Sequence, residues 1–325
     1  MIVDFHVHST ASDGTCTPSE LAEKSKGFAA IALTDHDNCE GVEEFLRRQE
    51  CRLPAPGSTE GPQKSGRRHS CRRIPGIELS IEPGEGFDKF HLLGLGIDPA
   101  NENLKAFLKR ILDGRNDRNA RIIENFHRLG IDLGVGERCR CRMEVENSTL
   151  HLLSTPTSIF SYAHGEVLAR PHFARWLVDH GHAADIRDAF ARYLLPDSPT
   201  ETRCYEERWH PTQEDAFRVI HEAGGICVMA HPKYWCTDWK TAGSDYAAAE
   251  RELAALKERG LDGVEALYQA NTNEENIAFT RIATKLGYLK TAGSDFHGSN
   301  KPTISLGMEV SEEFIAPVLE RLDMV

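Results

Sequence analysis

Two histidines, His6 and His8, stand two positions apart in the apolar segment IVDFHVH near the start of the chain. Alternate side chains of a β-strand point to the same face, so this spacing places both imidazoles on one side of the predicted strand. Paired imidazoles can bind a divalent cation. Because an isolated HxH pair is more often incidental, its meaning depends on which other ligands lie nearby.

Further candidate ligands recur at the ends of later apolar segments. They are carboxylate or imidazole groups that stand in or just after a predicted strand: Asp35, His36, Asp37, Glu78, His91, His231, Asp295 and His297. In a parallel barrel the strand ends converge on one face, where barrel enzymes place their catalytic groups. Imidazole and carboxylate without thiolate suit Zn, Mn, Fe or Mg. We therefore expect a cluster of divalent ions whose shared hydroxide attacks a phosphoryl group.

The elements that must position these residues follow an alternating pattern. Short apolar runs alternate with amphipathic stretches over residues 1–99 and again over 211–325, as is typical of βα units around a parallel sheet. Residues 100–210 instead show helical periodicity at 101–131, 170–181 and 185–195. The predicted fold is an α/β barrel interrupted by a helical insertion domain. Residues 51–73, rich in Pro, Gly, Ser and Arg, are expected to form an irregular surface loop.

Composition narrows the class of protein. The chain has 38 basic and 50 acidic side chains, and its net charge of -12 does not indicate the positive surface that binds a long polyanion. No apolar run could cross a bilayer and no secretion signal is evident, so we expect a cytoplasmic protein without a membrane role. The nine cysteines are expected to be reduced, and the close pair Cys139 and Cys141 to be incidental. No obligate protein partner is evident.

Six segments, in order, resemble the polymerase and histidinol phosphatase (PHP) family of metal-dependent phosphoesterases: DFHVHSTASDG, ALTDHD, PGIELS, FHLLG, MAHP and GSDFHG. The resemblance implies a distorted seven-stranded β/α barrel, related to that of amidohydrolases, with a trinuclear site of Mn, Zn or Fe. In that family the first ion would be bound by His6, His8, Glu78 and Asp295, the second by Asp13, His36 and His297, and the third by Glu78, His91 and His231. Glu78 would thus bridge two ions.

Asp13 stands where many relatives have a histidine, and this variation resembles a subgroup of small-nucleotide phosphatases. Its alternative role is that of a turn residue in the sequence SDG. The segment ARPHFARWL also resembles that subgroup, which implies that Arg170 and His172 hold phosphate oxygens and that the insertion acts as a lid. The alternative for Arg170 is a solvated residue at a helix start with Pro171 in the first turn.

Two other basic features have open alternatives. Lys233 directly follows the AHP motif and is either a phosphate contact or a solvated surface group. The basic group Arg67, Arg68, Arg72 and Arg73 is either part of a soluble loop or a contact for a second phosphate or an RNA strand. We favour the loop.

The expected function is hydrolysis of small phosphorylated metabolites, of the nucleotide bisphosphate or sugar phosphate type. Glu78, Asp295, Arg170 and His172 are the expected catalytic residues, and Arg170, His172 and Lys233 the expected substrate contacts. Alternatives are a cyclic phosphodiesterase and a 5'-3' exoribonuclease acting on short RNA. Less favoured are a non-catalytic accessory domain of the same fold and an amidohydrolase acting on a C–N bond.

Overall fold

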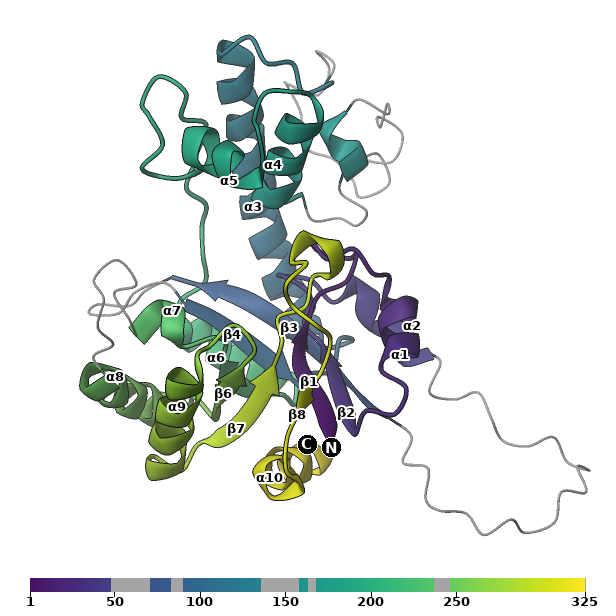
Figure 1. The fold of residues 1–325 in the computed structure, drawn as a ribbon, viewed down its shortest axis with the longest axis vertical. Coiled ribbons are helices and arrows are strands. Elements are labelled where there is room, and N and C mark those ends of the chain that lie inside the picture. The colour runs from purple at the N-terminus through teal and green to yellow at the C-terminus, as the bar shows by residue number, and fades with distance from the viewer. Residues whose placement is uncertain (48–70, 83–89, 136–157, 163–167, 237–245, 325) are drawn as a thin grey trace, which may run out of the picture.

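The computed structural model describes the chain except residues 48–70, 83–89, 136–157, 163–167, 237–245 and 325. Its centre is an eight-stranded sheet in the order β7-β6-β5-β4-β3-β2-β1-β8. The strands are β1 (Ile2–Val7), β2 (Ala30–Leu33), β3 (Arg72–Ile81), β4 (Phe90–Leu95), β5 (Ile226–Met229), β6 (Gly263–Tyr268), β7 (Leu289–Gly293) and β8 (Met308–Glu309). Figure 1 shows this sheet curled into the lower body of the molecule. The predicted α/β barrel class is confirmed.

The sheet is mixed rather than parallel, and this corrects the expected strand directions. β1, β2 and β3 run parallel, as do β5, β6 and β7, but β4 is antiparallel to both of its neighbours. The connection between β3 and β4 spans only residues 82–89, which is too short for the crossover that parallel strands need. Because β4 is reversed, His91 near its start pairs with Ser80 near the end of β3. The reversal therefore brings His91 to the same end of the barrel as Glu78.

The barrel nearly closes where β1 meets the end of β7. Val7 and Phe296 form a parallel bridge, and the backbone N–H of Asp295 donates to the carbonyl of His6 at 2.9 Å. In the same contact between β1 and the end of β7, the buried Asp4 carboxylate accepts hydrogen bonds from the backbone N–H and the hydroxyl of Ser294, at 3.0 and 2.6 Å. Burial outweighs these bonds and raises the pKa of Asp4 to about 6. These contacts thus fix β1, which carries His6 and leads to His8, against the end of β7.

Helices pack around the outside of the barrel (Figure 1). They are α1 (Pro18–Lys24), α2 (Glu40–Arg47), α6 (Gln213–Glu222), α7 (Lys233–Cys236), α8 (Tyr246–Glu258), α9 (Asn273–Lys285) and α10 (Glu312–Asp323). Thr17 and Thr272 begin α1 and α9 with capping boxes, in which the threonine hydroxyl accepts a backbone N–H and a glutamate three residues on returns the contact. The sequence patterns did not predict α7, β8 or α10, although the Ser311 hydroxyl accepts the backbone N–H of Phe314 at the start of α10.

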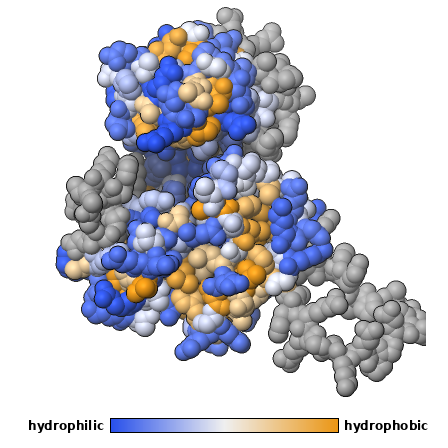
Figure 2. Space-filling view, viewed as in Figure 1, coloured by the Kyte–Doolittle hydropathy of each residue, from blue (hydrophilic) through white to orange (hydrophobic). Residues whose placement is uncertain are grey.

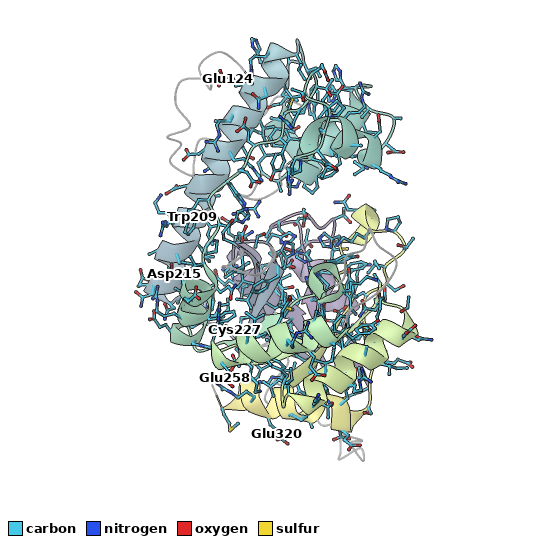
Figure 3. All side chains as sticks on the ribbon, turned by 90° about the vertical axis from the view of Figure 1, so that its left-hand side faces the viewer. Glu124, Trp209, Asp215, Cys227, Glu258 and Glu320 are labelled. Carbon is cyan, nitrogen blue, oxygen red and sulfur yellow. The ribbon has the colours of Figure 1, made fainter. Side chains whose placement is uncertain are left out.

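The insertion consists of α3 (Glu102–Arg128), η3 (Ile159–Tyr162), α4 (Arg170–Asp179), α5 (Ile186–Ala189) and η4 (Phe190–Leu194). Leu104 and Ile111 of α3 join the apolar cluster of the barrel, whereas Ile122 and Phe126 join a separate cluster with Phe173. Figure 3 shows α3 passing the barrel beside Trp209 and continuing upward to Glu124. One helix therefore links one of the apolar clusters of the barrel with that of the insertion, and the domain limits given above stay a prediction.

The predicted loop over residues 51–73 is wrong at its end, because β3 begins at Arg72. Arg72 donates to the carbonyl of Leu319 at 2.9 Å, and Arg73 donates to that of Phe45 at 3.2 Å. Both side chains thus hold the start of β3, the end remote from Glu78, to the neighbouring helices α10 and α2. Arg67, Arg68, Cys139 and Cys141 lie outside the described residues. Among the described helices, none is both long and apolar enough to cross a membrane.

Candidate metal centre

The carboxylate of Glu78 lies at the centre of a cage of imidazoles. Glu78 is fully buried in β3, and a nitrogen from each of five histidines lies within 3.3 Å of its oxygens: His6, His8, His36, His91 and His231. Burial alone would raise the pKa of Glu78, but the surrounding imidazoles hold it well below its usual range. The five histidines come from the ends of three strands, β1, β2 and β5, and from the start of β4, which the reversal of β4 makes possible.

A second carboxylate, Asp13, faces three of the predicted ligands from the loop after β1. Its oxygens lie 3.2 Å from His297 Nε2, 3.8 Å from His36 Nε2 and 3.9 Å from His8 Nδ1. The tight turn that contains Asp13 depends on Gly14, where a Cβ would lie 2.3 Å from the His8 carbonyl oxygen. The SDG sequence therefore forms a turn and also directs Asp13 toward the histidines, so the two roles considered for Asp13 are compatible.

Asp295 follows β7 and contacts the same group of histidines. Its Oδ1 lies 3.5 Å from His8 Nε2 and 3.7 Å from His6 Nε2, while its Oδ2 accepts bonds from the Tyr268 hydroxyl at 3.0 Å and from Lys301 Nζ at 2.5 Å. The backbone φ of Asp295 is 58°, in the left-handed region that non-glycine residues rarely adopt. Such strain is commonly held at functional sites.

Several polar atoms in this cage are buried and have no hydrogen-bond partner among the residues that the structure describes. They are Nε2 of His6, both ring nitrogens of His8, Nδ1 of His36 and Oε2 of Glu78. Unpaired buried polar atoms are unfavourable, and here most of them face one another with lone pairs. Divalent cations would satisfy them, and the mixture of imidazole and carboxylate suits borderline cations. The residues present therefore fit metal ions, and their ligand atoms form three groups: His8, Asp13, His36 and His297; His6, Glu78 and His231; and His6, His8 and Asp295.

Glu265, which was not predicted from the sequence, supports the cage from β6. Its Oε1 lies 3.1 Å from His6 Nδ1, and its Oε2 accepts the backbone N–H of His231 at 2.6 Å. The contact depends on Gly293, because a Cβ there would lie 2.0 Å from Glu265 Oε1. A carboxylate behind a ligating imidazole fixes its tautomer and orientation. The signal for it was present, since Glu265 is the one charged residue in the apolar strand sequence GVEALY.

Asp35 and Asp37, which also follow a predicted strand, have other partners. Asp35 accepts the backbone N–H and hydroxyl of Ser9, at 2.7 and 2.6 Å, and so holds the loop after β1. Asp37 Oδ2 accepts bonds from Arg115 Nε at 2.8 Å and from Arg208 Nη2 at 2.9 Å. Asp35, before His36, thus holds the loop after β1. Asp37, after His36, binds one arginine of α3 and one of the segment that leads to α6.

The predicted phosphate contacts lie in different surroundings. His172 lines a cleft of about 910 Å³ together with Asp13, His36 and His297, and its Nδ1 accepts the backbone N–H of Ala169 at 2.9 Å. Lys301, not foreseen from the sequence, also lines this cleft. Figure 2 shows the molecule narrowing to a hydrophilic waist between the insertion and the barrel.

Arg170 and Lys233 are bound to other parts of the protein. Arg170 Nη1 donates to the carbonyl of Leu194 at 3.3 Å, and its guanidinium lies 5.3 Å from the ring centre of Tyr205. Lys233 Nζ donates to the Ala270 carbonyl at 2.8 Å and to Glu275 at 3.1 Å. The structure thus brings the nine predicted ligands and His172 to one end of the barrel, whereas the sequence candidates Arg170 and Lys233 contact other protein groups.

Comparison with known proteins gives consistent similarities. Residues 4–133 match the family model described as PHP domain. The chain is 30% identical to a 3',5'-nucleoside bisphosphate phosphatase from Chromobacterium violaceum, over 91% of this chain and 87% of the relative. It is 27% identical to the 5'-3' exoribonuclease Rnm of Salmonella typhimurium, over 95% of this chain and 89% of the relative.

Two solved structures share the fold over nearly the whole chain. One, described as an amidohydrolase from Chromobacterium violaceum with bound sulfate and no metal, has a TM-score of 0.71 and 27% identity, covering 99% of this chain and 96% of the other. The second, described as a proposed metal-dependent phosphoesterase from Bifidobacterium adolescentis, has a TM-score of 0.68 and 25% identity, covering 98% and 96%. The two descriptions differ in the bond they name, while the fold is the same.

Proposed function

Because the chain belongs to the PHP domain family and is a metal-dependent hydrolase of phosphoesters, we propose that its substrates are small phosphorylated metabolites, nucleoside bisphosphates first among them. The observation that carries this proposal is the cage around Glu78, in which five imidazoles surround one buried carboxylate beside a cleft. The relative named as a nucleoside bisphosphate phosphatase supports this choice of substrate.

We assign the metal ligands as three overlapping sets for divalent ions, with Mn, Zn or Fe as candidates. His6, His8, Glu78 and Asp295 would hold one ion; Asp13, His36 and His297 a second; and Glu78, His91 and His231 a third. Ions bound there would supply an activated water near neutral pH and neutralise the charge of a phosphoryl group. Glu78 and Asp295 are catalytic in this assignment because their negative charges would offset the repulsion between neighbouring cations held by the histidines.

His172 is the side chain best placed to meet the substrate from the insertion. Since its Nδ1 accepts the N–H of Ala169, the proton of the neutral ring resides on Nε2. His172 also lines the cleft with three of the assigned ligands, so it can donate to a phosphate oxygen or to the leaving oxygen. Arg170, two residues earlier, contributes positive charge, and Lys233 would have to leave Glu275 to reach a phosphate.

Phosphate release by the manganese-loaded protein tests the proposal. The panel contains adenosine 3',5'-bisphosphate, sugar phosphates, cyclic nucleotides and short 5'-phosphorylated RNAs. We expect the bisphosphate to be hydrolysed fastest and the Glu78→Gln variant to release no phosphate. Glu222→Gln, which removes one charge from the exposed surface of α6, is the matched control and keeps full activity. Equal release by the wild type and Glu78→Gln would contradict the assignment.

A second candidate function is supported by the exoribonuclease of Salmonella typhimurium, which matches 95% of this chain. The chemistry at the cage would be the same, with a phosphodiester in place of a monoester. The RNA arm of the panel separates the two, because release of mononucleotides from a 5'-phosphorylated oligomer occurs only with the nuclease. Activity on the bisphosphate but not on RNA would support the phosphatase function and exclude the exoribonuclease function.

A further inference from the structure

A large aromatic side chain beside the metal centre is exposed to solvent. Tyr234 lies in the short helix α7, three residues after the assigned ligand His231, and it is 53% exposed. Single exposed apolar side chains are common in soluble proteins, so their exposure alone has no functional meaning. The significance of Tyr234 depends on how its ring is held and on which groups surround it.

The ring of Tyr234 is held by two other rings of the site. Its centre lies 5.3 Å from that of His231 and 6.1 Å from that of Tyr268, with interplanar angles of 67° and 74°. These are edge-to-face contacts, an arrangement that aromatic pairs prefer. The backbone N–H of Tyr234 also donates to the carbonyl of His231 at 3.2 Å, and the φ of His231 is 29°. This turn directs the start of α7, and with it the tyrosine ring, toward the cage.

Tyr268 in turn is anchored to the cage. It is only 3% exposed, its hydroxyl donates to Asp295 Oδ2 at 3.0 Å, and its ring centre lies 5.7 Å from that of His231. Tyr234 therefore packs against a buried ring that is itself hydrogen-bonded to an assigned metal ligand. A side chain fixed in this way loses little conformational freedom when a ligand covers it, and such preorganisation favours binding.

The charge next to Tyr234 is already balanced within the protein. Lys233 Nζ lies 5.6 Å from the centre of the Tyr234 ring, and it donates to the carbonyl of Ala270 at 2.8 Å and to the carboxylate of Glu275 at 3.1 Å. The ion pair with Glu275 offsets the positive charge of the lysine beside the ring. These surroundings suit a planar, uncharged group better than a second phosphate.

Tyr234 approaches the cage from a different direction than the cleft that contains His172. That cleft is lined by residues of the insertion and of the loops after β1 and β7, such as Asp13 and Lys301. Figure 1 shows α7 on the opposite side of the barrel from α1 and α2. A nucleotide whose phosphate lies at the cage can therefore extend its base toward Tyr234 without entering this cleft.

We propose that Tyr234 stacks against the nucleobase of the substrate, and that it makes the enzyme prefer nucleotides to phosphate esters that have no base. This inference rests on the proposed function and makes it more specific, because it assigns a part of the protein to the part of the substrate that does not react. Every nucleobase has a π face, so stacking on a tyrosine selects nucleotides as a class rather than one particular base.

The first test compares two substrates that differ only in the base. The ratio of kcat/KM for 2'-deoxyadenosine 3',5'-bisphosphate to that for the same compound without its base is measured for the wild type and for Tyr234→Ala. We expect the ratio to fall at least about fivefold in Tyr234→Ala, the lower limit for loss of one base stack. Tyr234→Phe retains the ring and should keep most of the ratio. An unchanged ratio in folded Tyr234→Ala overturns the proposal.

A matched control removes exposed apolar surface elsewhere. Ile277 of α9 is 70% exposed, and Ile277→Ala should leave the substrate ratio at the wild-type value. A fall in Ile277→Ala equal to that in Tyr234→Ala would show that the ratio does not report on stacking at Tyr234, and would overturn the proposal.

Metal content and the separate kinetic constants distinguish stacking from a structural role. Stacking stabilises the bound substrate and the transition state alike, so Tyr234→Ala should raise KM for the nucleotide with little change in kcat. If Tyr234 only supports His231 and Tyr268, the variant instead loses manganese and hydrolyses both substrates more slowly by the same factor. That result, seen by mass spectrometry and by the two rates, would contradict the proposal.

A binding experiment separates this inference from the proposed function. Phosphonate analogues of the two compounds, which cannot be hydrolysed, are titrated by calorimetry into manganese-loaded wild type and Tyr234→Ala. Binding that weakens at least about fivefold for the nucleotide analogue alone supports stacking, even if the wild type releases no phosphate from any nucleotide. Equal affinity of the two proteins for the nucleotide analogue, or an equal loss for both analogues, overturns the stacking role of Tyr234.

Discussion

The cage around Glu78 lies next to a second buried centre, the arginine cluster, in which Arg115 of α3 and Arg208 both contact Asp37 and Arg118 lies one turn further along α3. In each, one fully buried carboxylate accepts contacts from several nitrogen groups. The difference lies in the nitrogen chemistry. Imidazoles can be neutral and then offer lone pairs, so the cage favours cations, whereas guanidinium groups stay charged and favour anions. A phosphate ester needs both, and the two centres stand one residue apart along the chain, at His36 and Asp37.

The largest expected effect comes from the carboxylate of the cage. Glu78→Gln keeps the shape of the side chain but removes the charge that lets five histidines surround bound cations. We expect kcat to fall by about 1000-fold or more, the upper range for loss of one electrostatic contact in an active site. Metal content by mass spectrometry should fall in parallel. A variant that retains both its metal and its turnover would contradict the role of Glu78 in holding cations at the cage.

The carboxylate of the arginine cluster should matter for folding before it matters for activity. Asp37→Asn leaves Arg115 and Arg208 buried without their counter-charge. We expect the free energy of unfolding to fall by about 3–5 kcal/mol, as when one partner of a buried ion pair is removed. Urea denaturation measures this. A loss below about 1 kcal/mol would mean that another acidic group already balances the cluster.

The pH dependence of that loss can be checked separately. Burial opposes ionisation of Asp37, but Arg115 and Arg208 hold its pKa well below the usual range. A depressed pKa adds stability above the unfolded value, near 3.8, and loses it as pH falls through the folded value. The gap in stability between the wild type and Asp37→Asn should therefore be constant from about pH 8 to 5 and narrow below about pH 4. A gap that closed already near neutral pH would contradict the ion pair.

Glu265 should have an intermediate effect, because it acts through His6. Glu265→Gln keeps a hydrogen-bonding group near His6 Nδ1 but removes the charge. Loss of such an outer partner typically lowers metal affinity or activity about 10-fold to 100-fold. The prediction is checked by manganese titration of kcat, which should shift to higher concentrations at a nearly unchanged maximum. A fall in the maximum alone would place Glu265 in the reaction itself.

The smallest effect is expected from the exposed arginine of α3. Arg121→Gln breaks an ion pair with Glu206 at 3.3 Å, on the solvent side of the helix that carries Arg115 and Arg118. Such exposed pairs contribute about 0–1 kcal/mol, so the free energy of unfolding should stay close to the wild-type value. A large loss would show that charge on α3, rather than position in the cluster, governs the behaviour of the arginines.

The sequence predicts contacts that follow from spacing within one strand better than contacts between residues far apart in the chain. His6 and His8 could be placed together because a strand repeats every two residues, and the barrel brings His231 and Asp295 to the same end. The direction of β4 was predicted wrongly because apolar content does not reveal strand direction. Asp37 was grouped with candidate ligands, although its carboxylate contacts arginines far along the chain.

The arginine cluster was beyond the reach of local patterns. Arg115 and Arg118 read as ordinary charged residues of an amphipathic helix, and Arg208 lies about 90 residues away in an irregular segment. Arg115 and Arg208 meet only in the folded chain, at the carboxylate of Asp37. Glu265 is the reverse case, because a single acid inside an apolar strand is a local signal and could have been used.

The central claim is that the cage holds divalent ions on which phosphoester hydrolysis depends. The most direct test is phosphate release from adenosine 3',5'-bisphosphate while metal-depleted wild type and Glu78→Gln are titrated with manganese. Release by the wild type should rise with manganese and saturate at a fixed number of ions per chain, while Glu78→Gln releases none at any concentration. Release that does not depend on manganese, or that is equal in the two proteins, would contradict the account.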